Sequence, residues 1–131
     1  MKNLMFIPFL FVCNMLMGQA VSSFSVIGKS IKIGNLIVAQ NDFPNGMNWN
    51  DAKENCKKLG VGWRLPTQNE LNTMCENRDK IGWVQRGGDW GIYWSSSNYD
   101  ANYAWLQKFG SCTQDAIEKK FLAYARAVRT Q

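Results

Sequence analysis

The sequence predicts an α+β domain in which two helices pack on small antiparallel sheets joined by long loops. Two segments, residues 48–59 and 67–76, carry apolar side chains at helical spacing. The segments before and after them alternate apolar and polar residues, as strands do. The resulting order is strand, strand, helix, helix and then strands, which is not the βαβ alternation of a parallel sheet. A chain of 131 residues is enough for one such domain.

The first strands form a predicted hairpin. Ser30–Ile33 and Leu36–Ala39 are short, largely apolar runs on either side of Gly34-Asn35. A glycine-containing pair between two such runs is typical of a tight hairpin turn. Pro44-Asn45-Gly46 then interrupts the chain before the first helix.

The first helix is predicted to run from Asn48 to Leu59. Asn48 is a good N-cap, and Gly60 is a good residue to end the helix. Four apolar residues recur along one side of this helix: Trp49, Ala52, Cys56 and Leu59.

The second helix is predicted from Thr67 to Glu76, and its start is the clearest local signal in the chain. Pro66 favours extended backbone before it. Thr67 followed by Glu70 three residues later makes a capping box. Three apolar residues form the expected inner face: Leu71, Met74 and Cys75.

The later part of the chain is predicted to contain strands. Residues 80–91 read as a loop that holds Trp83 and Trp90. The expected elements that follow are a strand at Ile92–Ser95, a turn at residues 96–100, a strand at Tyr103–Phe109, a turn at Gly110–Thr113 and a last strand at Phe121–Arg129.

The first twenty residues are predicted to be a secretory signal peptide. Lys2 precedes an apolar run over residues 4–12, and Gly18-Gln19-Ala20 offers small residues at a cleavage site. The apolar run is too short to span a bilayer. Residues 21–131 are then expected to form one exported domain without a transmembrane segment.

Cysteine usage leaves two interpretations open for the exported part. Cys56, Cys75 and Cys112 remain after loss of Cys13 with the signal. They can provide one disulfide and one free thiol in an oxidising compartment, or three small buried side chains. The spacing does not select a pair.

Composition argues against several function classes. The formal net charge is +5 and the basic residues are scattered, so the chain lacks the dense basic stripe of a nucleic-acid-binding protein. The chain contains no histidine, which removes Ser-His-Asp and Cys-His catalysis and the commonest metal ligand. We therefore expect no catalytic residues, no metal site and no cofactor.

One segment has the composition of a recognition surface. Residues 95–103 combine serine, asparagine, aspartate and two tyrosines. Tyrosine supplies rigid contact area, and serine and asparagine supply adaptable hydrogen bonds.

Several motifs together resemble one bacterial family. These are Trp49-x-x-Ala52-x-x-x-Cys56, Gly62-Trp63-Arg64-Leu65-Pro66-Thr67-x-x-Glu70-Leu71, Tyr93-Trp94-Ser95-Ser96-Ser97, Ala104-Trp105-x-x-x-Phe109 and Arg126-Ala127-Val128-Arg129. In this order they resemble the domain named after the C-terminal part of the Legionella collagen-like protein, also met as the Fibrobacter major paralogous domain. The resemblance covers roughly residues 36–129 and implies a C-type-lectin-like fold. That family is related to the formylglycine-generating enzyme and to the variable proteins of diversity-generating retroelements.

The resemblance also implies roles for individual residues. The positions that face ligand in the variable proteins map here onto Asn98, Tyr99, Asp100, Asn102, Gln107 and Gln114. The positions that match the structural motif are Trp63, Arg64, Pro66, Thr67, Glu70, Trp94, Trp105, Arg126 and Arg129. Trp94, Trp105 and Phe109 are expected in the core. The three arginines are expected to donate hydrogen bonds to loop carbonyls.

Two positions depart from the family pattern. Cys112 stands where a glycine is expected in the late turn. Ala127 stands where some relatives carry a cysteine that could bridge to the first helix, so Cys56 is expected to lack that partner.

The first functional hypothesis is an exported, non-enzymatic module that binds an extracellular or cell-surface glycan, peptide or protein. One alternative is an oxidase of the formylglycine-generating type, which would need Cys75 and Cys112 close together. Another is a structural surface or adhesion subunit. The localisation expected from the signal peptide is secreted, periplasmic or cell-surface.

Overall fold

A computed structural model describes residues 22–82 and 91–131. The expected signal peptide at residues 1–20 and the loop tryptophans Trp83 and Trp90 lie outside the described residues. None of the helices in the described ranges has the length and apolar character that a bilayer crossing requires.

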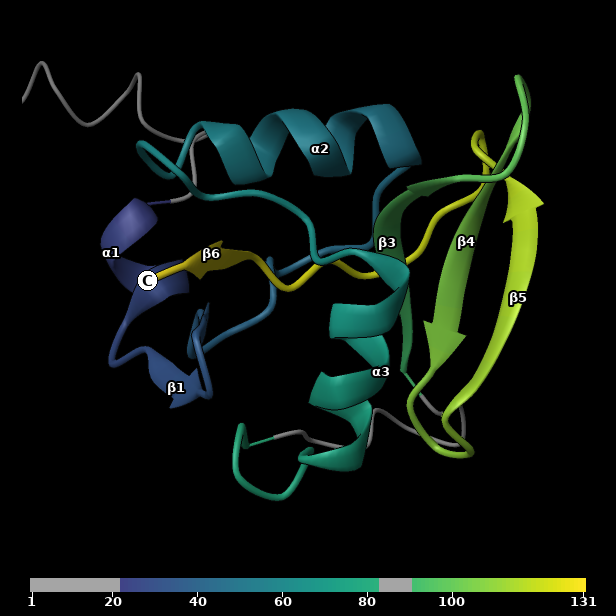
Figure 1. The fold of residues 1–131 in the computed structure, drawn as a ribbon. Coiled ribbons are helices and arrows are strands. Elements are labelled where there is room, and N and C mark those ends of the chain that lie inside the picture. Colours follow the sequence, from purple (N-terminus) through teal and green to yellow (C-terminus); the bar gives the residue numbers. More distant parts are fainter. Residues whose placement is uncertain (1–21, 83–90) are drawn as a thin grey trace, which may run out of the picture.

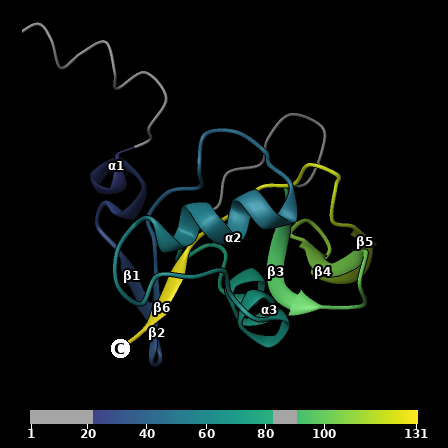
Figure 2. The same cartoon turned by 90° about the horizontal axis from the view of Figure 1, so that it is seen from above.

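The described chain forms three helices and two three-stranded antiparallel sheets. The elements are α1 (Ser23–Ile27), β1 (Ile31–Ile33), β2 (Leu36–Val38), α2 (Trp49–Lys57), α3 (Gln68–Glu76), β3 (Ile92–Asn98), β4 (Tyr103–Lys108), β5 (Thr113–Glu118) and β6 (Val128–Thr130). The sheet orders are β1-β2-β6 and β3-β4-β5. Figures 1 and 2 show the two sheets at opposite sides of the molecule, with α3 between them. The predicted α+β class is confirmed.

The first half of the chain follows the sequence prediction closely. The β1–β2 hairpin turns at Gly34, whose φ of 60° suits a glycine. Asn48 caps α2, because its side chain accepts a hydrogen bond from the Asp51 amide. Thr67 and Glu70 form the predicted capping box at α3. The short helix α1 was not expected, since residues 24–43 alternate like a strand.

The second half differs from the prediction in three places. β3 continues to Asn98, so the turn begins later than predicted. β5 was not predicted at all, and it pairs with β4 along its whole length. The expected strand at residues 121–129 is mostly wrong, because only Val128–Thr130 pairs as a strand, against β2.

The rest of that last segment is extended backbone that crosses the middle of the molecule (Figure 1). Its hydrogen bonds go to different elements in turn: the Ala123 amide donates to Met47, and the Tyr124 amide donates to Ile92. Further along, Ala127 accepts from the Ala39 amide. The three buried alanines at 123, 125 and 127 allow this close approach.

Two apolar clusters lie on opposite faces of the β3-β4-β5 sheet. One contains Trp94 and Leu106 with the inner side of α2. The other contains Tyr93 and Phe109 with the inner side of α3. The sheet is therefore anchored from both sides, and its far end, at the β3–β4 turn, is left open to solvent.

Candidate ligand-binding surface

The β3–β4 turn is exposed and internally bonded. All five residues from Asn98 to Asn102 are exposed. Asp100 Oδ1 accepts hydrogen bonds from the amides of Asn102 and Tyr103, both at 2.8 Å. This local side-chain-to-backbone pattern holds a turn in one conformation. The turn is thus a fixed projection at the end of the sheet.

Beside the turn lies a hollow of about 370 Å³, which we call the aromatic hollow. Its lining residues are Tyr99, Asp100, Tyr103, Trp105, Asp115 and Ala116. The Tyr99 ring meets the Tyr103 ring at 6.3 Å and the Trp105 ring at 5.3 Å, both edge to face. The three rings therefore form an angled cup instead of one flat platform.

The strand pattern explains why these side chains meet. Tyr103 and Trp105 are two residues apart on β4, so they point to the same face. Ala116 of β5 lies directly opposite Trp105. An alanine at that position is too small to fill the space beside the indole ring.

A second hollow of about 360 Å³ lies on the other side of the turn, and we call it the polar hollow. It is lined by Asn48, Asn50, Ala101, Asn102, Glu118, Lys119 and Lys120. Lys119 Nζ donates to the carbonyls of Asp100 and Ala101 and lies 4.5 Å from the Trp49 ring centre. The two hollows thus differ in composition: one is aromatic and acidic, the other amide-rich and basic.

The six predicted ligand-facing residues are separated by the fold. Tyr99 and Asp100 line the aromatic hollow, and Asn102 lines the polar hollow. Asn98 is exposed at the end of β3. Gln114 is exposed as well, but its amide is bonded to Gln68.

The outward position predicted for Gln107 is wrong. Its side chain has no exposed surface, because α3 and the 110–112 turn cover that end of β4. Gln107 Nε2 donates to Asn72 of α3 at 2.8 Å and to the Cys112 carbonyl at 3.1 Å. Its Oε1 accepts from Gln114 at 2.9 Å. Gln107 therefore joins α3 to the sheet.

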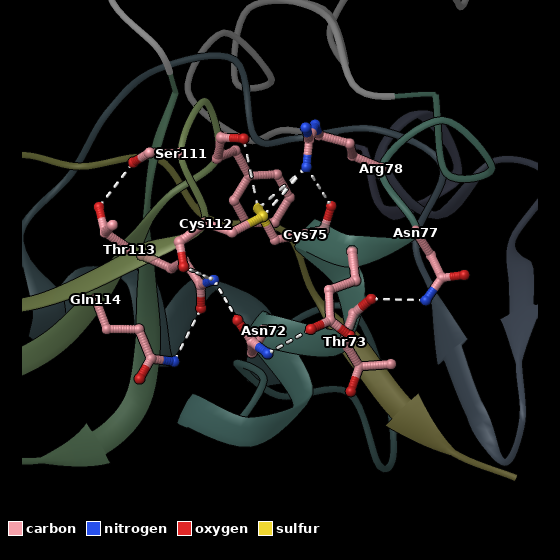
Figure 3. Close-up of a disulfide and its surroundings, with 12 residues drawn as sticks. Asn72, Thr73, Cys75, Asn77, Arg78, Ser111, Cys112, Thr113 and Gln114 are labelled. Atoms are coloured by element: carbon pink, nitrogen blue, oxygen red, sulfur yellow. Dashed lines mark hydrogen bonds between the residues drawn. A yellow bond between two sulfur atoms is a disulfide. The ribbon is translucent and has the colours of Figure 1, made fainter.

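A disulfide also joins α3 to this end of the sheet (Figure 3). Cys75, at the end of α3, is bonded to Cys112 in the turn before β5. Arg78 Nη1 lies 3.1 Å from the Cys112 sulfur. Cys112 has a φ of 56°, the conformation that a glycine would favour, which explains why the family pattern expects glycine there.

Cys56 remains free, as expected from the absence of a cysteine at position 127. It is buried against the apolar side of α2, and this burial raises the pKa of its thiol to about 12. The interpretation with one disulfide and one free thiol is thus confirmed. The oxidase alternative required Cys75 and Cys112 to lie together, and they do; Cys75, however, is fully buried.

The two most specific motifs bond to each other. The Ser96 amide donates to the Pro66 carbonyl at 2.7 Å, and Ser97 Oγ accepts from the Gln68 amide at 2.9 Å. Ser95 Oγ donates to the Trp105 carbonyl at 2.7 Å. The serine run therefore ties the start of α3 to the strand that carries the aromatic hollow.

Arg64 forms an ion pair with a carboxylate, that of Glu70. Its two terminal nitrogens bond both oxygens of Glu70, at 2.6 and 3.0 Å, and the Leu65 carbonyl accepts a further bond. The hydrogen bond to Arg64 holds the pKa of the Glu70 carboxyl below its usual range, and the same bond raises the pKa of Arg64. Glu70 also accepts from the Thr67 amide, so the ion pair and the capping box share one carboxylate.

Arg126 bonds the carbonyls of Ala39 and Ile81, as predicted for the motif arginines. It also forms an ion pair with Asp42 at 2.6 Å, and both side chains are about 5% exposed or less. Asp42 accepts from the Tyr93 hydroxyl as well. Arg129 differs from the prediction: it is exposed and lies 5.7 Å from the centre of the Trp63 ring.

Trp94 and Phe109 are buried as predicted, at 0% and 1% exposure. Trp105 is only half-buried, so its expected place in the core is wrong. Tyr103 belongs to the segment 95–103 that was predicted as a recognition surface, whereas Trp105, Asp115 and Ala116 were not predicted to lie there. The signal for Trp105 was present, because Tyr103-x-Trp105 places two aromatic rings on one side of a strand.

Within the described ranges, no three histidine, cysteine, aspartate or glutamate side chains come together as metal ligands would. The arrangement of the turn and the two hollows instead offers rings, carboxylates and amides on an exposed, fixed surface.

Comparison with known proteins gives a consistent picture. Residues 29–129 match the family described as the Lcl C-terminal domain. No curated protein matches the chain. Among solved structures it is similar to botrocetin, with a TM-score of 0.61 and 13% identity over 79% of this chain and 98% of that one. It is also similar to a chain in a complex of botrocetin with the von Willebrand factor A1 domain, with a TM-score of 0.56 and 12% identity over 79% and 98%.

A third similar structure is EMS16, an antagonist of the collagen receptor integrin α2β1, with a TM-score of 0.56 and 12% identity over 78% of this chain and 97% of that one. At these identities the likeness shows the fold alone. The family match covers most of the chain, from the first hairpin to β6. The chain therefore belongs to the Lcl C-terminal domain family, and its fold is C-type-lectin-like.

Proposed function

We propose that this protein is an exported, non-enzymatic module that binds a glycan, peptide or protein through the surface around its β3–β4 turn. The observation that carries this proposal is the aromatic hollow, which three aromatic residues and two aspartates line on an exposed surface. Exposed aromatic clusters with a polar rim are common at recognition sites.

The scaffold behind this surface is rigid. The turn is held by the Asp100 side chain, and β4 is tied to α3 through Gln107. β3 is tied to α2 through the Trp49 indole, which donates to the Ser95 carbonyl. A surface that is already ordered loses little conformational entropy when it binds. This favours recognition over a purely structural role for the turn.

The similar structures support the proposal by analogy. One is a complex with the von Willebrand factor A1 domain, and another is an antagonist of an integrin, so each of them has a protein partner. Export is supported by the disulfide, since such bonds persist in oxidising compartments. It is also supported by the signal-peptide pattern at residues 1–20.

The test compares the wild type with Tyr99→Ala and with a control on another surface, Val61→Ala, because Val61 is 98% exposed. Purified protein is presented to a glycan array and to cell-surface extracts. We expect ligands that the wild type and Val61→Ala retain and Tyr99→Ala loses. Identical retention by all three proteins would contradict the proposed surface, and turnover of a cysteine-containing client would contradict the non-enzymatic assignment.

A further inference from the structure

The aromatic hollow has a charge opposite to that of the whole chain. The formal net charge is +5, yet the two charged residues that line this hollow are Asp100 and Asp115. The polar hollow across the turn contains both lysine and glutamate. The aromatic hollow is thus a local acidic site on a basic protein, which is an arrangement that selects for a cation.

Neither carboxylate forms an ion pair with another residue in the described ranges. The hydrogen bonds of Asp100 both end on Oδ1, and Asp115 Oδ1 accepts from the adjacent Ala116 amide. Lys119 reaches this turn, but it donates to the backbone carbonyls of Asp100 and Ala101. Asp100 therefore keeps Oδ2 for a ligand, whereas Asp115 lies opposite Leu106 on β4, so its side chain leaves β5 on the face opposite to Trp105.

The rings suit a cation as well. A lysine or arginine side chain is attracted to the face of an aromatic ring within about 6 Å of its centre. Because the Tyr99 ring is inclined by 67° to the Tyr103 ring and by 71° to the Trp105 ring, ring faces meet at an angle around the hollow. A sugar ring stacks best on one flat, open face, whereas an angled cup surrounds a narrow, charged group.

The size of the hollow limits its occupant. Its volume of about 370 Å³ is at the small end of the range for ligand pockets, which is roughly 300–1,000 Å³. That space holds one long side chain better than an oligosaccharide. From these observations we infer that the aromatic hollow binds a lysine or arginine side chain presented by an exposed loop of a partner protein. This inference rests on the proposed function.

The experiment uses two small probes that differ in charge alone. N-acetyl-arginine amide carries a guanidinium, and N-acetyl-citrulline amide is its neutral isostere. Each is titrated into the protein, and the indole N–H signal of Trp105 is followed by NMR. We expect saturable shifts with the arginine probe and at least about tenfold weaker binding of the citrulline probe. Equal affinities of the two probes, or no shift at Trp105, would overturn the inference.

Matched variants test the role of the carboxylate. Asp100→Asn removes one charge from the hollow and keeps the Oδ1 acceptor for the amides of Asn102 and Tyr103. Glu118→Gln removes the same charge from the neighbouring polar hollow. We expect the first variant to weaken arginine binding about three- to tenfold and the second to leave it unchanged. Equal weakening in both would mean that only overall charge matters and would overturn the site.

A third arm separates this inference from the proposed function. Methyl glycosides are titrated in the same way. If they shift the Trp105 signal and the arginine probe does not, the cation inference fails while the proposed binding surface stands. If wild type and Tyr99→Ala retain the same ligands in the array and extract experiment above, the proposed function fails, and the cation inference fails together with it.

Discussion

The two acidic sites of this molecule are built in opposite ways. Inside, Asp42 is paired with Arg126 and bonded to Tyr93, and the pair is almost fully buried. At the surface, Asp100 and Asp115 line the aromatic hollow, and neither forms an ion pair with another described residue. The motif residues that the sequence marks most strongly thus stabilise the fold. The carboxylates at the surface accept only local backbone hydrogen bonds within the described residues and form no ion pair there.

Breaking the buried site should produce the largest effect on stability. Arg126→Met removes one partner of a buried ion pair and leaves Asp42 charged in the interior, which typically costs about 3–5 kcal/mol. Urea unfolding followed by tryptophan fluorescence measures the change. Arg129→Met is the matched control, because Arg129 is exposed three residues later in the chain; a similar loss in both variants would contradict the importance of the buried pair.

Removing the disulfide should have the next largest effect. Cys75 and Cys112 are 37 residues apart, and closing a loop of that length stabilises a domain by about 3–4 kcal/mol. We expect the double variant Cys75→Ala/Cys112→Ala to unfold at a correspondingly lower urea concentration and to be insensitive to reductant. The wild type and Cys56→Ala should both respond to reductant, and a reductant-insensitive wild type would argue against the bond.

Removing the Arg64–Glu70 ion pair should lower the free energy of unfolding by an intermediate amount that depends on pH. Glu70→Gln keeps a side chain suited to the capping box and removes the charge that pairs with Arg64. Because the pKa of Glu70 is lowered in the folded state, its contribution is present above the unfolded value of about 4.3 and is lost as the pH falls through the folded value.

We therefore expect a loss of about 0.5–1 kcal/mol at pH 7 that shrinks toward zero in acid. Urea unfolding at several pH values measures the difference between the two proteins. Glu54→Gln, on the exposed side of α2, is the control. A Glu70→Gln penalty that stayed constant down to pH 2.5 would rule out the ion pair as its origin.

Removing an aromatic ring from the aromatic hollow should have the smallest effect on the free energy of unfolding. Tyr99 is 56% exposed, so Tyr99→Ala should change the free energy of unfolding by no more than about 0.5 kcal/mol. Binding and stability should therefore separate at this position, in contrast to Arg126. A large loss of stability in Tyr99→Ala would mean that the turn holds the fold together.

The sequence predicted those parts of the structure whose causes are local. The capping box at Thr67 and the N-cap at Asn48 depend on residues within one helical turn, and both formed as expected. β5 was missed because Thr113–Glu118 is rich in residues with little preference for strands, and only its pairing with β4 makes it one.

The binding surface was predicted only in part for a similar reason. Strand alternation places Trp105 and Gln107 on the same side of β4, but the pattern does not tell which of them another element covers. α3 and the turn at Cys112 cover Gln107, and Trp105 lies beyond their reach. The Asp42–Arg126 ion pair could likewise not be predicted, because its members are far apart in the sequence.

The course of the last segment has a consequence for biogenesis. β6 completes the first sheet, and the backbone of residues 123–127 runs between the two sheets. A nascent chain that lacks these residues has neither a finished sheet nor a closed interior. The domain thus reaches its native state only once this last segment has been synthesised.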